Sequence, residues 1–169
     1  FNDMASSELV LERTMDIDYD TYAEGEALLG WLNAGYKLVA TRPFDGRSLT
    51  LKLAQQMQAE LQRHHVEIAH LKMTLSPTNS KDTKPIVLNL VRTDDEPTIA
   101  SGSAKVALQG NLLLNLRAEA DPKLLHETMH RATQLMERCS HVTATLNHLQ
   151  AFRPARPQPT HRISPLNEA

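Results

Sequence analysis

The chain has few of the residues that build disulfide frameworks, phosphate loops and aromatic clusters. Its 169 residues include one cysteine, six glycines, one tryptophan, three tyrosines and three phenylalanines. One cysteine excludes an internal disulfide and a cysteine-based zinc cluster, so we expect Cys139 to be a small apolar side chain on the buried side of a helix. The glycines are scattered singly, and no phosphate-binding loop, nucleophile elbow or dinucleotide-binding pattern occurs.

The chain also lacks a long apolar run and a strong net charge. No run approaches the roughly 18 apolar residues of a membrane span, and no secretory signal is visible. A formal net charge of −2 argues against a general nucleic-acid binder, which normally carries a basic field. With 41% hydrophobic residues the chain can bury a core. We therefore expect one cytoplasmic domain with terminal arms, and neither a membrane nor a nucleic acid as partner.

The stretch from Gly110 to Cys139 predicts a buried strand that leads directly into an amphipathic helix. Apolar residues alternate with polar ones up to Ala118, which is the period of a strand with one buried face. Asp121 is a good N-cap and Pro122 is favoured at the first helical position. The predicted buried side of the helix carries Leu125, Thr128, Met129, Ala132, Leu135, Met136 and Cys139.

The remaining elements follow from the same periodicities. Residues 28–40 predict a strand, 42–46 a turn, and Ser48 the N-cap of a helix that ends near His64. Its apolar stripe is Thr50, Leu53, Ala54, Met57 and Leu61. Further strands are predicted over 67–75, 86–92 and 142–149, the last with Val142, Ala144 and Leu146 inward, and 98–109 is expected to be a long connection with a helical turn at 104–108.

This order predicts an α+β domain, a mostly antiparallel sheet with two helices on one face. Removing one strand gives an order related to the ferredoxin-like split βαβ arrangement. We expect a partly irregular N-terminal arm over 1–27, a single domain over 28–151 and a Pro-rich basic tail over 152–169. The prolines of the tail favour an extended arm.

The sheet face opposite the helices is expected to be polar and mildly cationic. Asparagine is disfavoured in strands, so three of them on one face suggest recognition, although a solvated face is the ordinary alternative. Both interpretations stay open at this point. The candidate binding residues are Asn33, Lys37, His70, Lys72, Asn89, Asn115 and Arg117, with Arg153 and Arg156 from the tail; Thr143, Thr145 and Asn147 are expected on the same face.

Arg117 is the strongest member of this set because an unpaired guanidinium is costly to bury. Either Glu119 pairs with it, or the position accepts an anionic ligand or a carboxylate of a partner. A guanidinium fork suits both cases.

A zinc-protease pattern, His126-Glu127-x-x-His130, lies in the predicted second helix. Two histidines four residues apart share a helix face and could bind zinc, with Glu127 as the general base. The pattern lies beside the apolar stripe, however, which favours a solvated helix shoulder. A zinc-dependent hydrolase is therefore the alternative hypothesis, and no cofactor is expected otherwise. A self-associating structural domain is a third hypothesis.

Four phrases of the chain look like the C-terminal region of bacterial cobalamin-synthesis (CobW-like) GTP-binding proteins. They are YAEGEALLGWLN (22–33), IAHLKMTLSP (68–77), LNLRAEADP (114–122) and FRPARP (152–157). The resemblance implies a domain appended to a nucleotide-hydrolysing metallochaperone or related switch. Because the phosphate loop is missing here, it implies a non-enzymatic binding or regulatory domain, whose partner is another protein or a linked GTPase domain.

Overall fold

The computed structural model describes residues 21–22, 24–25, 28–78, 84–102 and 106–156. By their contacts, residues 28–153 form one compact unit, and 1–27 with 154–169 form another. In the second unit, residues 21, 22, 24 and 25 are helical. Most of the predicted N-terminal arm and the predicted extended arm beyond residue 156 lie outside the described residues.

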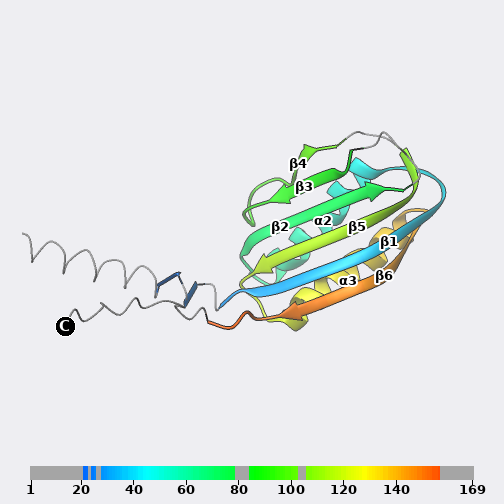
Figure 1. The fold of residues 1–169 in the computed structure, drawn as a ribbon. Coiled ribbons are helices and arrows are strands. Elements are labelled where there is room, and N and C mark those ends of the chain that lie inside the picture. Colours follow the sequence, from blue (N-terminus) through cyan, green and yellow to red (C-terminus); the bar gives the residue numbers. More distant parts are fainter. Residues whose placement is uncertain (1–20, 23, 26–27, 79–83, 103–105, 157–169) are drawn as a thin grey trace, which may run out of the picture. The chain divides into compact units, whose positions relative to one another are not determined.

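Residues 28–153 form an α+β fold, as predicted: an antiparallel sheet with two helices on one face (Figure 1). The sheet has six strands in the order β4-β3-β2-β5-β1-β6. Every neighbouring pair is antiparallel. The elements are β1 (Gly30–Asp45), α2 (Gly46–Arg63), β2 (Ile68–Pro77), β3 (Ile86–Leu90), β4 (Thr98–Ser101), β5 (Val106–Ala118), α3 (Pro122–Cys139) and β6 (Val142–Phe152).

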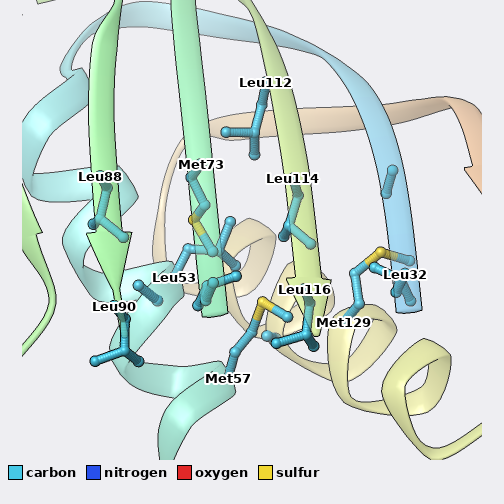
Figure 2. Close-up of a cluster of buried hydrophobic side chains, with 14 of the residues drawn as sticks. Leu32, Leu53, Met57, Met73, Leu88, Leu90, Leu112, Leu114, Leu116 and Met129 are labelled. Atoms are coloured by element: carbon cyan, nitrogen blue, oxygen red, sulfur yellow. The ribbon is translucent and has the colours of Figure 1, made fainter. Parts of the chain in front are cut away.

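The core lies between the sheet and the helices and is built mainly from leucine and methionine (Figure 2). Alternate residues of β1, β2, β3 and β5 point towards the helices. The predicted stripe of α2 is confirmed, since all five of its residues are buried. Figure 2 labels Leu32, Leu53, Met57, Met73, Leu88, Leu90, Leu112, Leu114, Leu116 and Met129 in this layer.

The prediction for residues 98–109 was wrong. Residues 98–101 form β4, which pairs with β3, and β5 already begins at Val106. The sheet therefore has two strands, β3 and β4, more than the ferredoxin-like arrangement, where one was predicted. Without these two, the elements follow each other as strand-helix-strand-strand-helix-strand, and the strands lie in the spatial order β2-β5-β1-β6. The assignment to a ferredoxin-like order stays a prediction.

The start of α2 also differs from the prediction. β1 continues through the predicted turn to Asp45, whose carboxylate accepts from the backbone N–H groups of Arg47, at 2.9 Å, and Ser48, at 3.3 Å. Asp45 is therefore the N-cap in place of Ser48. Both residue types cap helices well, and the longer β1 decides between them.

Helix α3 begins as predicted, with Asp121 as N-cap and Pro122 in the first turn. Its buried side is rotated from the prediction, since Leu135 and Cys139 are exposed and Thr133 is buried. Thr133 lies against β1, where its hydroxyl oxygen is 3.4 Å from that of Tyr36. Thr133 therefore lies on the side of the helix that faces the sheet.

A register shift in β6 changes which of its residues face the helices. Tyr36 of β1 pairs with Leu146, while the preceding Gly35 pairs with His148, so β6 carries an extra residue. Leu146 lies opposite the buried Tyr36, on the predicted side of the sheet, but 44% of this residue is exposed. Beyond the shift, Leu149 packs against the core. After the shift, the open face receives His148, Gln150 and Phe152.

Candidate binding surface on the open sheet face

The face that the helices leave uncovered is defined by two rows of side chains, each running across several strands. We call them the open-face rows. The first row joins Phe152, Trp31, Arg117 and His70 in register across β6, β1, β5 and β2. The second row joins Gln150, Asn33, Asn115, Lys72 and Asn89. Strand register thus brings together residues that are up to 121 positions apart in the sequence.

The aromatic residues order the first row. The guanidinium carbon of Arg117 lies 3.9 Å from the centroid of the Trp31 ring, which is a cation–π stacking distance. On the other side, the Trp31 and Phe152 ring centroids are 5.9 Å apart with planes tilted by 47°. The ring of Trp31 is therefore held between β5 and β6, and it holds the guanidinium of Arg117 in turn.

A direct amide contact orders the second row. The side-chain nitrogen of Asn115 donates to the side-chain oxygen of Asn33 at 2.7 Å. This bond uses one donor of Asn115 and one acceptor of Asn33. The amide nitrogen of Asn33 and the amide oxygen of Asn115 have no hydrogen-bond partner among the described residues.

A hollow of about 180 Å³ lies between the two rows. It is smaller than the usual range of about 300–1,000 Å³ for drug-sized ligands, and it suits a single carboxylate-bearing side chain or a small anion. Its lining residues are Trp31, Asn33, His70, Lys72, Asn115 and Arg117. Five of these six belong to the set predicted from the sequence, and Trp31 is the addition.

The charge of this surface is not neutralised within the described ranges. Every ion pair found there involves Glu60 or Glu127, and neither Arg117 nor Lys72 belongs to one. Of the two alternatives for Arg117, the ion pair with Glu119 is not formed. The assumption that Arg117 is buried was also wrong, since its side chain is exposed and stacks on Trp31. The indole N–H of Trp31 is buried and finds no acceptor in the described part of the chain.

The other predicted site residues lie apart from the hollow. Lys37 is farther along β1, opposite Asn111, and Asn89 lies beyond Lys72 on β3. Arg153 donates to the carbonyl oxygen of Leu28 at 3.1 Å, so it anchors the end of β6 to the start of the domain. Arg156 belongs to the other contact unit and is not placed relative to this face.

Sequence reasoning did not select Trp31, His148, Gln150 or Phe152. Trp31 alternates with the predicted core residues of β1, so its outward position could be read from the sequence. The three residues of β6 could not, because strict alternation would continue from Val142 without the register shift.

The histidines of the zinc pattern share the exposed shoulder of α3, with ring centroids of His126 and His130 6.4 Å apart. Glu127 is 4.0 Å from Lys123. Within the described residues, no group of three His, Cys, Asp or Glu side chains could hold a metal ion. A catalytic zinc needs three protein ligands, and the described residues offer no third ligand beside His126 and His130.

A second hollow, of about 370 Å³, lies between the start of α2 and the end of α3. Its walls mix apolar residues such as Phe44 and Met136 with the opposite charges of Asp45 and Lys52. None of the binding or metal-site residues predicted from the sequence lines it, and its positive and negative side chains do not favour one type of ligand. The smaller hollow on the sheet is the better candidate because its polar groups stand on paired strands.

These features define the class of the protein: an α+β domain whose two helices cover one face of an antiparallel sheet, with cations and amides on the other face. Comparison with protein-family models, with curated proteins and with solved structures gives no match to this chain. The likeness to the CobW-like proteins therefore stays a prediction. No helix in the described ranges is long and apolar enough to cross a membrane.

Proposed function

We propose that this chain is a non-enzymatic binding or regulatory domain that engages an acidic partner protein through the open-face rows. The observation that carries the proposal is the guanidinium of Arg117, stacked on Trp31 and without a carboxylate partner, beside Lys72. Two cations and three amide or imidazole groups around a small hollow suit a carboxylate.

Preorganisation supports this proposal. Stacking on Trp31 reduces the rotamer freedom that Arg117 would lose on binding, and the planar fork keeps its N–H groups available to a carboxylate. Asn33 and Asn115 orient each other in the same way. Binding of a partner should therefore cost little side-chain entropy at this surface.

A protein partner fits this surface better than a nucleic acid. Polyanion binding rests on many phosphate contacts, whereas Arg117 and Lys72 are the only lysine or arginine residues of the open-face rows, and the chain has a net charge of −2. Single-strand binders also stack bases on free aromatic rings, and here Arg117 covers one face of Trp31.

The particular partner follows from the resemblance described above. If the chain is the accessory part of a CobW-like protein, the partner is the linked GTPase domain or a protein that this domain serves. The non-enzymatic assignment rests on the sequence, which offers no acid–base pair at a spacing typical of catalysis.

The single tryptophan gives a direct test, because Trp31 is the only indole in the chain and lines the hollow. Titration with a glutamate-rich peptide should change its fluorescence in a saturable, salt-sensitive manner. A lysine-rich peptide of equal length should not. Saturable binding of a single-stranded oligonucleotide but not of the acidic peptide would overturn the proposal, and so would no response to either.

A further inference from the structure

The two edges of the sheet differ in how they are protected against pairing with another strand. β4 has only four residues and directly follows Pro97. β6 has eleven residues, and no strand of the described ranges pairs with its outer side. Val142–Phe152 contains no Asp, Glu, Lys, Arg or Pro. Natural edge strands are usually short, charged or interrupted by proline, so β6 lacks the ordinary protection.

The first half of β6 is nonetheless blocked by side chains from the end of α3. Ser140 accepts from the backbone N–H of Val142 at 3.2 Å, and Glu137 accepts from that of Ala144 at 2.7 Å. Another strand could not pair there without breaking these bonds. No side chain of the described residues bonds to the backbone of 148–152, which lies beyond the register shift.

We propose that residues 148–152 of β6 pair antiparallel with the same residues of a second copy of this chain, around a two-fold axis at Gln150. This register places His148 opposite Phe152 on the open face and Leu149 opposite Ala151 on the helix side, so faces match across the axis. The two six-stranded sheets then form one continuous sheet.

A second copy is favoured over a foreign strand because the segment is complementary to itself. It carries no formal charge, so antiparallel self-pairing places no like charges opposite each other at neutral pH. At the axis, the amide of Gln150 is both donor and acceptor and can bond its own copy. Phe152 is 38% exposed and gains cover from His148 of that copy. The inference does not depend on the acidic partner proposed above.

Sedimentation velocity of the full chain over a range of concentrations tests this. The unaltered chain should form a dimer, and Gln150→Lys should weaken it about fourfold or more, because two like charges then meet at the axis. Gln150→Glu should weaken it likewise. An equimolar mixture of the two variants should restore a heterodimer, which a merely misfolded variant could not do.

Thr143→Lys is the matched control, since it adds the same charge to the blocked half of β6, and it should leave the dimer unchanged. A chain that stays monomeric at every concentration would overturn the proposal. So would a dimer that Gln150→Lys leaves unchanged, or variants whose mixture associates no better than either alone.

Discussion

The two faces of β5 show how differently one strand can be constrained. Leu112, Leu114 and Leu116 are buried under the helices, and the alternate residues Leu113 and Arg117 are exposed. Packing dictates the first set, since close-packed interiors register changes of a single methylene. Nothing in the packing requires an arginine on the other face. The helix-covered face is therefore constrained by stability, and the open face is the one through which we propose that a partner binds.

The sharpest test of this contrast uses neighbouring leucines. Leu114→Ala empties a site that is 1% exposed and should lower the free energy of unfolding by about 2–5 kcal/mol. Leu113→Ala removes the same atoms from a residue that is 57% exposed and should change it by about 0.5 kcal/mol or less. Urea denaturation measures both. Equal losses would contradict the assignment of faces.

Two glycines of β1 give the next largest difference. A Cβ at Gly30 would overlap the carbonyl oxygen of Ala120, so Gly30→Ala should cost about 1–3 kcal/mol through backbone displacement. At Gly35 the added atom would meet Leu113 at 3.5 Å, an ordinary contact on the open face. Thermal unfolding of Gly35→Ala should therefore match that of the parent chain, and a loss as large as that of Gly30→Ala would refute this reading.

Alkaline pH should lower the free energy of unfolding through Tyr36, a buried residue of the helix-covered face. Burial raises the pKa of Tyr36 above its ordinary value. Between about pH 10, where tyrosine ionises in an unfolded chain, and the higher pKa of the folded state, only the unfolded chain releases this proton. The free energy of unfolding should then fall as pH rises through that window. Tyr36→Phe removes this contribution, so a fall of equal steepness in the variant would exclude Tyr36 as its source.

The smallest expected effect concerns the zinc pattern on α3. Glu127 and Lys123 are 47% and 82% exposed and 4.0 Å apart, and such a surface pair contributes about 0–1 kcal/mol. Glu127→Ala should leave both stability and any hydrolytic activity of the chain unchanged. Stoichiometric zinc after dialysis, together with a hydrolase activity that Glu127→Ala abolishes, would favour the alternative hypothesis.

Local patterns predicted the layers of the fold because alternation and helical stripes are consequences of burial. They identified the stripe of α2, the start of α3 and five of the six residues around the sheet hollow. They failed where the outcome depended on long-range pairing. Because of the extra residue in β6, Phe152 lies on the open face, and residues 98–101 form a strand because they pair with β3. The stacking of Arg117 on Trp31 joins two strands whose register no local pattern supplies.

Arg117→Ala, measured for stability and for acidic-peptide binding in the same buffer, tests the central claim most directly. The stacked guanidinium is exposed, so its loss should cost only about 0.5–1 kcal/mol of unfolding free energy. Binding, followed by intrinsic fluorescence with the change in Trp31 emission calibrated for the variant, should weaken at least about tenfold, as expected for a charged hydrogen-bonding partner. Arg138→Ala, at an exposed arginine of α3, should change neither quantity. Loss of more than about 2 kcal/mol of stability with unchanged binding would show that Arg117 is structural, and would contradict the account.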